Sequence, residues 1–294
     1  MHLSRQTKVL IGALLVALIA GGAFFFAHGK GASEAAMSGD QARYAETPSE
    51  ATPAPMATAS STAQARVPIV VYHIVRPSYP SDSAAVKALA LTPEIFDAEM
   101  KYLKDAGYHV VPFSALENYF LKGTPLPSHP IIISFDDGWS DQFTYAFPIL
   151  EKYRYPATFF VFTNPIGTRG FLTWDNLREM RDAGMTIASH SRSHPFLTKI
   201  TDPSVLWNEI DGSKQTLEKH LGITVTEFAY PFGQYNDAIV ALVKKAGYRA
   251  ARGDYVQHGG KQSLDQLYEL SALNAPTTLD LFKRKFPAVM ASAP

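Results

Sequence analysis

Short apolar runs alternate with helical patterns over residues 67–253, and this alternation constrains the fold more than any other feature of the chain. Three helical segments end in Ala-Gly just before an apolar run, and glycine commonly supplies the left-handed residue that ends a helix. Nearly continuous apolar strands separated by helices are typical of a parallel sheet covered by helices. We therefore predict an α/β fold with mostly parallel strands, and closure of the sheet into a barrel is compatible with this pattern.

The predicted elements follow from these patterns. The strands are expected at Ile69–Tyr72, His109–Val111, Ile131–Phe135, Ala157–Phe162, Met185–Ala188 and Val225–Tyr230. The helices are expected at Pro93–Ala106, Asp141–Lys152, Trp174–Ala183, Pro203–His220 and Asn236–Ala246, with a short additional helix at Leu279–Phe286. The rest of the chain after Gly253 has no clear periodicity.

The N-terminus has the pattern of a membrane anchor. Arg5 and Lys8 precede an apolar run from Val9 to Ala27, and about 20 apolar residues can span a bilayer as a helix. The basic flank is expected to stay on the cytoplasmic side. We therefore expect residues 1–28 to be a signal anchor and the rest to lie outside the cytoplasm, in the periplasm or at the cell surface. A cleaved signal peptide is the alternative, and the protein would then be secreted.

Composition separates a linker from a domain and excludes two classes of function. Residues 29–66 are rich in Ala, Ser, Thr, Pro and Gly, so we expect a flexible linker before one domain at 67–294. The chain has 27 Lys+Arg and 27 Asp+Glu, and it therefore lacks the basic excess of most nucleic-acid-binding proteins. It has no cysteine, which excludes disulfides and Cys-ligated metals.

Two adjacent carboxylates follow the predicted strand Ile131–Phe135. Asp136 and Asp137 would repel each other and resist burial unless a cation or another partner compensates. A metal would lower that cost and would let one acid serve as ligand and the other as base. A helix N-cap followed by a turn at Gly138 is the structural alternative, and Asp-Asp-Gly alone favours it.

Two histidines follow the predicted strand Met185–Ala188. His190 and His194 are four residues apart, so both could face one metal if the segment forms a helical turn. A polar loop with two incidental histidines is the alternative. Functional residues gather at the carboxyl ends of parallel strands, and there Asp and two His would form a facial ligand set with open coordination positions.

These motifs together resemble those of the polysaccharide deacetylases with a NodB homology domain, carbohydrate esterase family 4. The resemblance covers Ser134–Gly138 and His190–His194, as well as Leu172–Asp175 and Phe228–Gly233, within about residues 67–253. It is nearest to the branch that deacetylates poly-β-1,6-N-acetylglucosamine in biofilm matrices. The family fold that it implies is a distorted (β/α)7-type barrel.

The resemblance also implies roles for single residues. Asp136 matches the general base, and the metal ligands match Asp137, His190 and His194. The expected metal is Zn2+, with Ni2+ or Co2+ also compatible. The backbone N–H of Phe232 would help to hold the oxyanion.

Aromatic residues near these motifs are candidates for contact with the sugar. Trp174 would line the groove beside the metal, and Tyr235 follows the third motif closely. Sugar rings commonly stack on aromatic side chains, although Trp139, which is also near a motif, could equally belong to the core.

The chain departs from the family pattern in two places. The third motif usually begins with Arg and has Tyr after Pro, but Ala229 and Phe232 stand at these positions, so the arginine that orients the base is expected to be missing. The late Leu-x-His motif is also absent. His73 ends the first strand of the domain, and a permuted strand order could bring it to the same place, so His73 is the candidate general acid. A structural role for His73 is the alternative.

The sequence therefore predicts a metal-dependent N-deacetylase of an N-acetylglucosamine-containing polysaccharide. The same site could instead act on peptidoglycan, chitin oligomers or an O-acetylated polysaccharide. A catalytically weak polysaccharide-binding module is an alternative from another class, because of the two departures. Expected partners are the acetylated polymer and the membrane, with polysaccharide synthesis or export machinery as an open candidate.

Overall fold

The computed structural model describes residues 63–254 and 260–288. The predicted anchor, residues 1–28, lies outside these residues, as does most of the predicted linker. The last linker residues are described, and Gln64–Arg66 form strand β1, which pairs antiparallel with β11, Lys261–Ser263. Within the described ranges, no helix is both long and apolar enough to cross a membrane.

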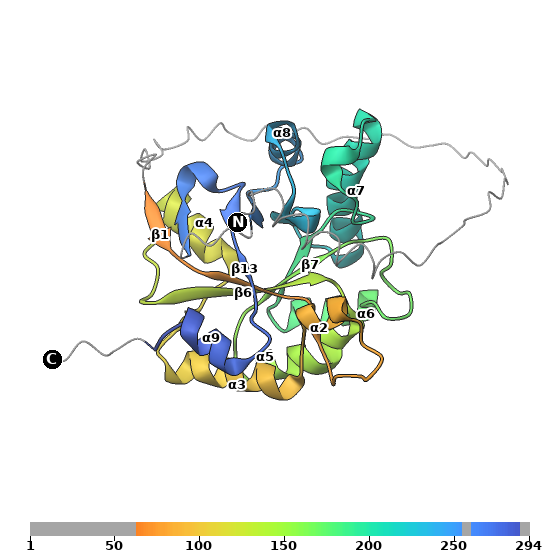
Figure 1. The fold of residues 1–294 in the computed structure, drawn as a ribbon. Coiled ribbons are helices and arrows are strands. Elements are labelled where there is room, and N and C mark those ends of the chain that lie inside the picture. Colours follow the sequence, from red (N-terminus) through yellow and green to blue (C-terminus); the bar gives the residue numbers. More distant parts are fainter. Residues whose placement is uncertain (1–62, 255–259, 289–294) are drawn as a thin grey trace, which may run out of the picture.

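The predicted α/β architecture is confirmed as a nearly closed barrel of parallel strands surrounded by helices (Figure 1). The strand order in the main sheet is β12-β10-β9-β8-β7-β6-β2-β13, and β5 pairs with the start of β6. The strands are β2 Ile69–Tyr72, β5 His109–Val110, β6 Pro130–Asp137, β7 Thr158–Val161, β8 Thr186–Ser189, β9 Glu227–Ala229, β10 Ala250–Asp254, β12 Leu270–Ser271 and β13 Leu273–Asn274. A small parallel pair, β3 Ile74–Val75 and β4 Ala90–Leu91, lies beside them.

The chain itself connects the two ends of this sheet. Strands β12 and β13 lie at opposite ends of the strand order, yet only Ala272 separates them in the sequence. Strand β13 pairs with β2 in parallel, so the first and last strands of the main sheet are neighbours. A residue that follows the first strand of the main sheet can therefore lie beside residues that follow its last strands.

The helices lie around the barrel. In Figure 1, α3, α5 and α9 lie on one side of the strands, and α4, α7 and α8 lie on the other. The helices are α2 Ala84–Leu89, α3 Pro93–Asp105, α4 Phe113–Lys122, α5 Phe147–Tyr153, α6 Trp174–Asp182, α7 Pro203–Leu221, α8 Asp237–Lys245 and α9 Leu279–Lys285, and a π-helical segment, Gln142–Ala146, precedes α5. The sequence had no clear signal for α2, α4 and the late strands.

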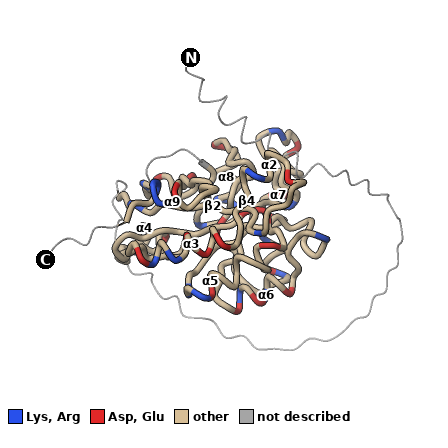
Figure 2. The backbone as a smooth tube through the Cα atoms, turned by 60° about the horizontal axis from the view of Figure 1, so that its bottom comes forward, with Lys and Arg blue, Asp and Glu red and all other residues tan. Residues whose placement is uncertain are grey.

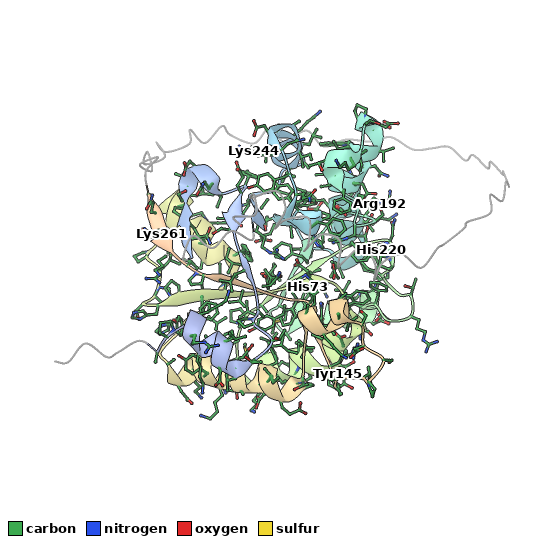
Figure 3. The ribbon with its side chains drawn as sticks, in the orientation of Figure 1. His73, Tyr145, Arg192, His220, Lys244 and Lys261 are labelled. Atoms are coloured by element: carbon green, nitrogen blue, oxygen red, sulfur yellow. The ribbon has the colours of Figure 1, made fainter. Side chains whose placement is uncertain are left out.

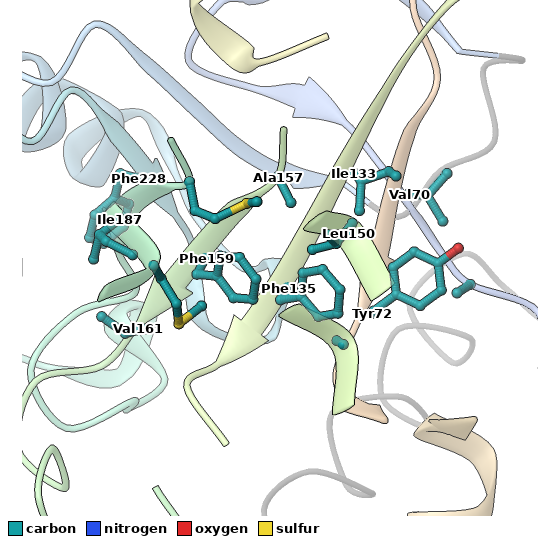
Figure 4. Close-up of a cluster of buried hydrophobic side chains, with 14 of the residues drawn as sticks. Val70, Tyr72, Ile133, Phe135, Leu150, Ala157, Phe159, Val161, Ile187 and Phe228 are labelled. Carbon is teal, nitrogen blue, oxygen red and sulfur yellow. The ribbon is translucent and has the colours of Figure 1, made fainter. Parts of the chain in front are cut away.

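The strands are buried on both faces, which explains their continuous apolar character. Outward side chains pack under the helices, where the rings of Phe135 and Phe159 stack at 4.6 Å and Tyr72 stacks on Phe135 (Figure 4). Inward side chains form a second cluster with α4, and three of its members are small: Ala188, Ala229 and Ala250. These alanines leave space inside the barrel for larger polar side chains.

Candidate metal centre and active site

Strand β6 brings two carboxylates to the carboxyl end of the barrel. Asp136 is fully buried, and Asp137 is 4% exposed. The backbone turns sharply after them, because Asp137 and Gly138 both have left-handed φ, of 75° and 78°. A Cβ at position 138 would lie 3.0 Å from Val161 Cγ1, so the glycine is needed for space as well as for conformation.

Strand β8 brings the two histidines to the same end, but not on the helical turn that their spacing suggested. Residues 190–194 form a loop, and Ser191 and His194 have left-handed φ of 70° and 58°. The Ser191 hydroxyl accepts the His194 N–H at 3.0 Å, which stabilises the turn locally. Non-glycine residues in this region are strained, and such strain is common at functional sites.

Glu209 of α7 holds the histidine loop from behind. Its Oε2 accepts the N–H groups of Arg192 and Ser193, both at 2.9 Å, and its Oε1 accepts the Ser193 hydroxyl at 2.6 Å. Glu209 is 8% exposed, and charge-assisted bonds of a sheltered carboxylate are stronger than neutral ones. The shape of the loop therefore depends on this one side chain of α7.

Three ligand atoms converge at this end of the barrel. One atom each from Asp137, His190 and His194 lies within 4.8 Å of the others. The two Nε2 atoms are 3.1 Å apart, and His194 Nε2 is 3.5 Å from Asp137 Oδ1. Two nitrogens and a carboxylate oxygen form the kind of donor set that zinc enzymes use, with coordination positions left open.

The histidines are in the form that binds metals. His190 Nδ1 bonds the Ala229 carbonyl at 2.7 Å, so Nδ1 carries the proton and Nε2 presents its lone pair to the centre. Burial lowers the pKa of both His190 and His194 to about 4. Both rings are therefore neutral at physiological pH, and the residues fit a divalent metal.

Trp139 fixes the orientation of the aspartate ligand. Its indole Nε1 donates to Asp137 Oδ2 at 3.0 Å, which leaves Oδ1 directed toward His194. The indole in turn stacks on Phe171 with a centroid distance of 4.7 Å. Trp139 is thus neither purely core nor a ligand, but a support for the metal-binding carboxylate.

Asp136 has one oxygen held and one free for chemistry. Its Oδ1 accepts a short hydrogen bond from Arg252 Nη2, whereas Oδ2 is buried and has no hydrogen-bond partner among the described residues. Oδ2 is 3.9 Å from His190 Nε2. A buried carboxylate oxygen without a partner next to a metal centre is suited to accept a proton from water or substrate.

An arginine, Arg252, does contact the base, and the expectation that this arginine is missing was wrong. Ala229 does stand where the third motif usually has Arg, but β10 supplies a guanidinium to the same carboxylate. Its side chain is fully buried and lies over the Phe160 ring at 4.6 Å. Sequence reasoning missed it because β10 begins where the helical and strand patterns become unclear. The available signal was a single charged residue among small residues in Ala250–Gly253.

Electrostatics keep Asp136 ionised. Burial alone would raise the pKa of this carboxyl, but the Arg252 guanidinium and the imidazoles around it outweigh burial and lower the pKa below its usual value of 3.8. Asp136 is therefore a carboxylate at physiological pH, as a base must be.

His73 lies on the other side of Asp136. Strand β2 pairs with β6 up to Tyr72 and Phe135, and His73 Nε2 is 3.9 Å from Asp136 Oδ2. The side chain is 6% exposed and lies near the middle of the fold (Figure 3). Strand β2 thus places His73 beside Asp136.

The aromatic candidates have different surroundings. Phe232 has a left-handed φ of 59°, and its ring packs 4.5 Å from His194 and 3.9 Å from Phe196, so it lies beside the ligands. The ring of Tyr235 packs 4.7 Å from that of Tyr230.

Trp174 is engaged elsewhere. Its indole stacks on His220 of α7 at 4.2 Å. His220 lies about three helical turns beyond Glu209, the residue that holds the histidine loop. Trp174 therefore packs between α6 and α7. Trp139 donates to Asp137, and the rings of Phe232 and Phe162 lie 4.5 and 5.4 Å from that of His194.

The comparisons with known proteins agree with this site. Residues 123–251, which contain both carboxylates, both histidines and the third motif, match the family model described as Polysaccharide deacetylase. This part of the chain is therefore a polysaccharide deacetylase domain. Among polysaccharide deacetylases, a putative one from Bacillus subtilis, YxkH, is 32% identical over 187 residues, 63% of each chain. The poly-beta-1,6-N-acetyl-D-glucosamine N-deacetylase of Staphylococcus aureus is 29% identical over 184 residues, 58% of this chain and 62% of that protein.

Solved structures of polysaccharide deacetylases share the fold. The Streptococcus pyogenes deacetylase PplD, in complex with acetate, superposes with a TM-score of 0.67 at 26% identity, over 73% of this chain and 94% of that chain. The match to the two curated relatives spans less than two thirds of their length. The family match itself covers residues 123–251 within the barrel, and it does not extend to His73 or Arg252.

Proposed function

We propose that this protein is a metal-dependent N-deacetylase of an extracellular polysaccharide of the poly-β-1,6-N-acetylglucosamine type. One observation carries the proposal: Asp136 Oδ2, which has no hydrogen-bond partner within the described ranges, lies near the converging ligand atoms of Asp137, His190 and His194. A base directly beside a metal centre, yet not needed as a ligand, is the arrangement that metal-assisted hydrolysis requires.

The residues divide the work as follows. A divalent metal held by Asp137, His190 and His194 would polarise the acetamide carbonyl and make a water molecule more acidic. Asp136 Oδ2 takes the proton from the attacking water, while Arg252 keeps that carboxylate ionised and oriented. The Phe232 N–H is the proposed donor to the oxyanion.

His73 completes the reaction as the proposed general acid. An amine is a poor leaving group unless it is protonated as the carbon–nitrogen bond breaks. His73 Nε2 lies 3.9 Å from Asp136 Oδ2, so both groups can reach one tetrahedral centre. The products are acetate and a glucosamine unit, whose amine becomes cationic and changes the charge of the polymer.

Two observations support catalysis over simple binding. The binding-module alternative rested on a missing arginine and a missing late histidine, and Arg252 and His73 now stand beside Asp136.

The N-linked substrate is supported by the name of the Staphylococcus aureus relative and by the departures in the third motif, which resemble the biofilm branch.

We also propose that the enzyme acts outside the cytoplasm, on a polymer emerging from synthesis or export machinery. This rests on the basic residues and the apolar run within residues 1–28. Lysines and arginines are mixed with acidic residues along the described backbone (Figure 2), and the nucleic-acid class therefore remains unsupported. Protease accessibility of the barrel in intact cells, compared with lysed cells, tests this location.

The decisive experiment measures acetate release by the full-length protein. The substrates are β-1,6- and β-1,4-linked N-acetylglucosamine oligomers, each tested after chelation and again after Zn2+ is restored. We expect metal-dependent release, faster from the β-1,6 oligomer. Faster release from the β-1,4 oligomer would instead favour peptidoglycan or chitin-type substrates. No release from either, with metal bound, would contradict N-deacetylation of such polymers.

A further inference from the structure

The base and the proposed acid come from strands that stop pairing just before them. The β2–β6 ladder ends at the pair Tyr72 and Phe135, so His73 and Asp136 are the first residues beyond it. Asp136 continues to pair with Phe160 of β7, but no pair of the β2–β6 ladder joins it to His73, although both residues must reach the same substrate atoms. A misplacement of about 1 Å can cost on the order of a hundredfold in rate.

Gln142 makes the missing connection. Its amide Nε2 donates to the backbone carbonyl of His73 at 2.9 Å and to that of Asp136 at 2.5 Å. The side chain is fully buried, so water does not compete for these bonds. Gln142 begins the π-helical segment, and π-helical turns are common at functional sites.

Asp141, the residue before Gln142, bonds the segment that follows His73. Asp141 Oδ1 accepts the N–H of Val75 at 3.3 Å, so residues 141 and 142 bind both a carbonyl and an N–H close to His73. The same turn therefore makes one bond each to the residue that follows β2, to strand β3 and to the end of β6.

From these contacts we propose that Gln142 is a positioning residue that sets the spacing between His73 and Asp136. Its amide bonds two backbone carbonyls, and it acts through them. The inference rests on the proposed function, because it assigns His73 the role of acid. Only an amide NH2 group suits the position: it offers two donors, a methionine offers none, and a glutamate at this position would place its oxygens against two carbonyls.

Gln262 is a matched control within the same chain. It is also a buried glutamine, and its Nε2 donates to two backbone carbonyls, of Val67 at 3.1 Å and of Ser271 at 2.8 Å. Val67 precedes β2 and Asp136 lies near the end of β6, so Gln262 lies toward the opposite end of the barrel. Its Oε1 also accepts the Ser271 N–H at 3.1 Å, so loss of its bonds should affect folding at least as much as loss of the Gln142 bonds, without moving the acid.

The test compares two substrates that differ in their need for an acid. The full-length protein, loaded with Zn2+, is given an N-acetylglucosamine oligomer and 4-nitrophenyl acetate, whose phenolate leaves without a proton. In Gln142→Met we expect kcat on the oligomer to fall by about tenfold to a hundredfold, with KM unchanged and ester hydrolysis within about twofold of the wild type. His73→Ala should show the same pattern, and the double variant should lose little more than His73→Ala alone.

Two outcomes would overturn the inference: an equal loss on both substrates, or the same selective loss in Gln262→Met. A crystal structure of Gln142→Met provides a readout that needs no polysaccharide. We expect the Nε2–Oδ2 separation of His73 and Asp136 to differ from 3.9 Å while Asp136 still contacts Arg252. An unchanged separation would contradict the inference. Absence of oligomer hydrolysis by the wild type would instead count against the proposed function alone.

Discussion

The buried pair of Asp136 and Arg252 shows how a single residue prepares the site. Two charges inside a barrel cost several kcal/mol to desolvate, and they persist only where they compensate each other closely. Arg252 also lies over the Phe160 ring at 4.6 Å, a contact that stabilises a buried cation. Asp136 Oδ2 has no hydrogen-bond partner in the part of the chain that the structure describes. The pair with Arg252 is costly to bury, but it gives a carboxylate that is ionised and oriented to act as a base.

The pH dependence of the reaction tests this pairing. Arg252 lowers the pKa of Asp136, and its removal in Arg252→Gln should raise that pKa. Asp136 would then be protonated at mildly acidic pH and could not act as a base. We expect the acid limb of the pH–rate profile to move to higher pH, with a loss of about tenfold or more at low pH that recovers as the pH rises. Arg252→Lys should restore part of the activity, whereas an equal loss at every pH would indicate a structural role only.

Substitution of the two adjacent aspartates should show that they have different roles. Asp136→Asn should reduce acetate release by at least about a hundredfold while Zn2+ still binds one to one. Asp137→Asn should lose Zn2+, because Asp137 contributes to the ligand cluster. Metal content by atomic emission and acetate release, measured on the same samples, check both variants. Loss of Zn2+ from Asp136→Asn would contradict the proposed division of roles.

At the scale of elements, α7 determines the shape of the loop that carries both histidine ligands. Glu209→Gln replaces a carboxylate that accepts two backbone N–H groups and a hydroxyl. Because the amide presents only one acceptor oxygen, we expect Zn2+ affinity to fall by about tenfold to a hundredfold. Chelator competition measures this. Asn208→Ala, which removes a contact to the Arg192 side chain only, is the control and should bind Zn2+ as the wild type does.

Helix α3 places a carboxyl group against strand β2, and this packing should make stability depend on pH. Glu99 is fully buried, and burial raises its pKa from 4.5 to about 8 although Tyr72 donates to it. The folded state therefore holds a proton that the unfolded chain releases above about pH 4.5. Its contribution to stability is complete below that pH and is lost as the pH rises toward 8, on the order of 5 kcal/mol.

Glu99→Gln should remove this part of the pH dependence, since glutamine still accepts from Tyr72 but does not titrate. Urea unfolding at pH 5 and pH 8 measures the effect. Glu117 has a pKa of about 7 and adds a pH dependence of the unfolding free energy with the same sign. The contribution of Glu99 is therefore the difference between the wild type and Glu99→Gln. Glu151→Gln on the exposed face of α5 is the control. A slope unchanged in Glu99→Gln would show that Glu99 is ionised in the folded protein.

The elements with strong periodicity were predictable, and those shaped by distant contacts were not. Strand β2 and helices α3, α6 and α8 agree with the predicted spans within a residue or two. The histidine segment was expected as a helical turn, but Glu209, far along the chain, holds it as a loop. Arg252 reaches Asp136 across 116 positions of sequence, and no local pattern encodes such a contact.

At the scale of the whole molecule, the metal centre links separate strands of the barrel. Asp137 comes from β6, the histidines follow β8, and the Ala229 carbonyl of β9 orients His190. A metal that binds only when these strands are assembled must stabilise the folded state, because the unfolded chain offers no such cluster. This stabilisation by a bound metal can be measured without any substrate.

Zinc should therefore raise the melting temperature. At a free concentration about one hundred times the Kd, the stabilisation is about 2.7 kcal/mol, which corresponds to a rise of roughly 5–10 °C for a domain of this size. Differential scanning calorimetry with and without chelator measures the shift. His190→Ala should abolish most of it, whereas Glu151→Gln should retain it in full. An equal shift in His190→Ala would mean that zinc binds elsewhere, and the centre formed by Asp137, His190 and His194 would lose its thermodynamic support.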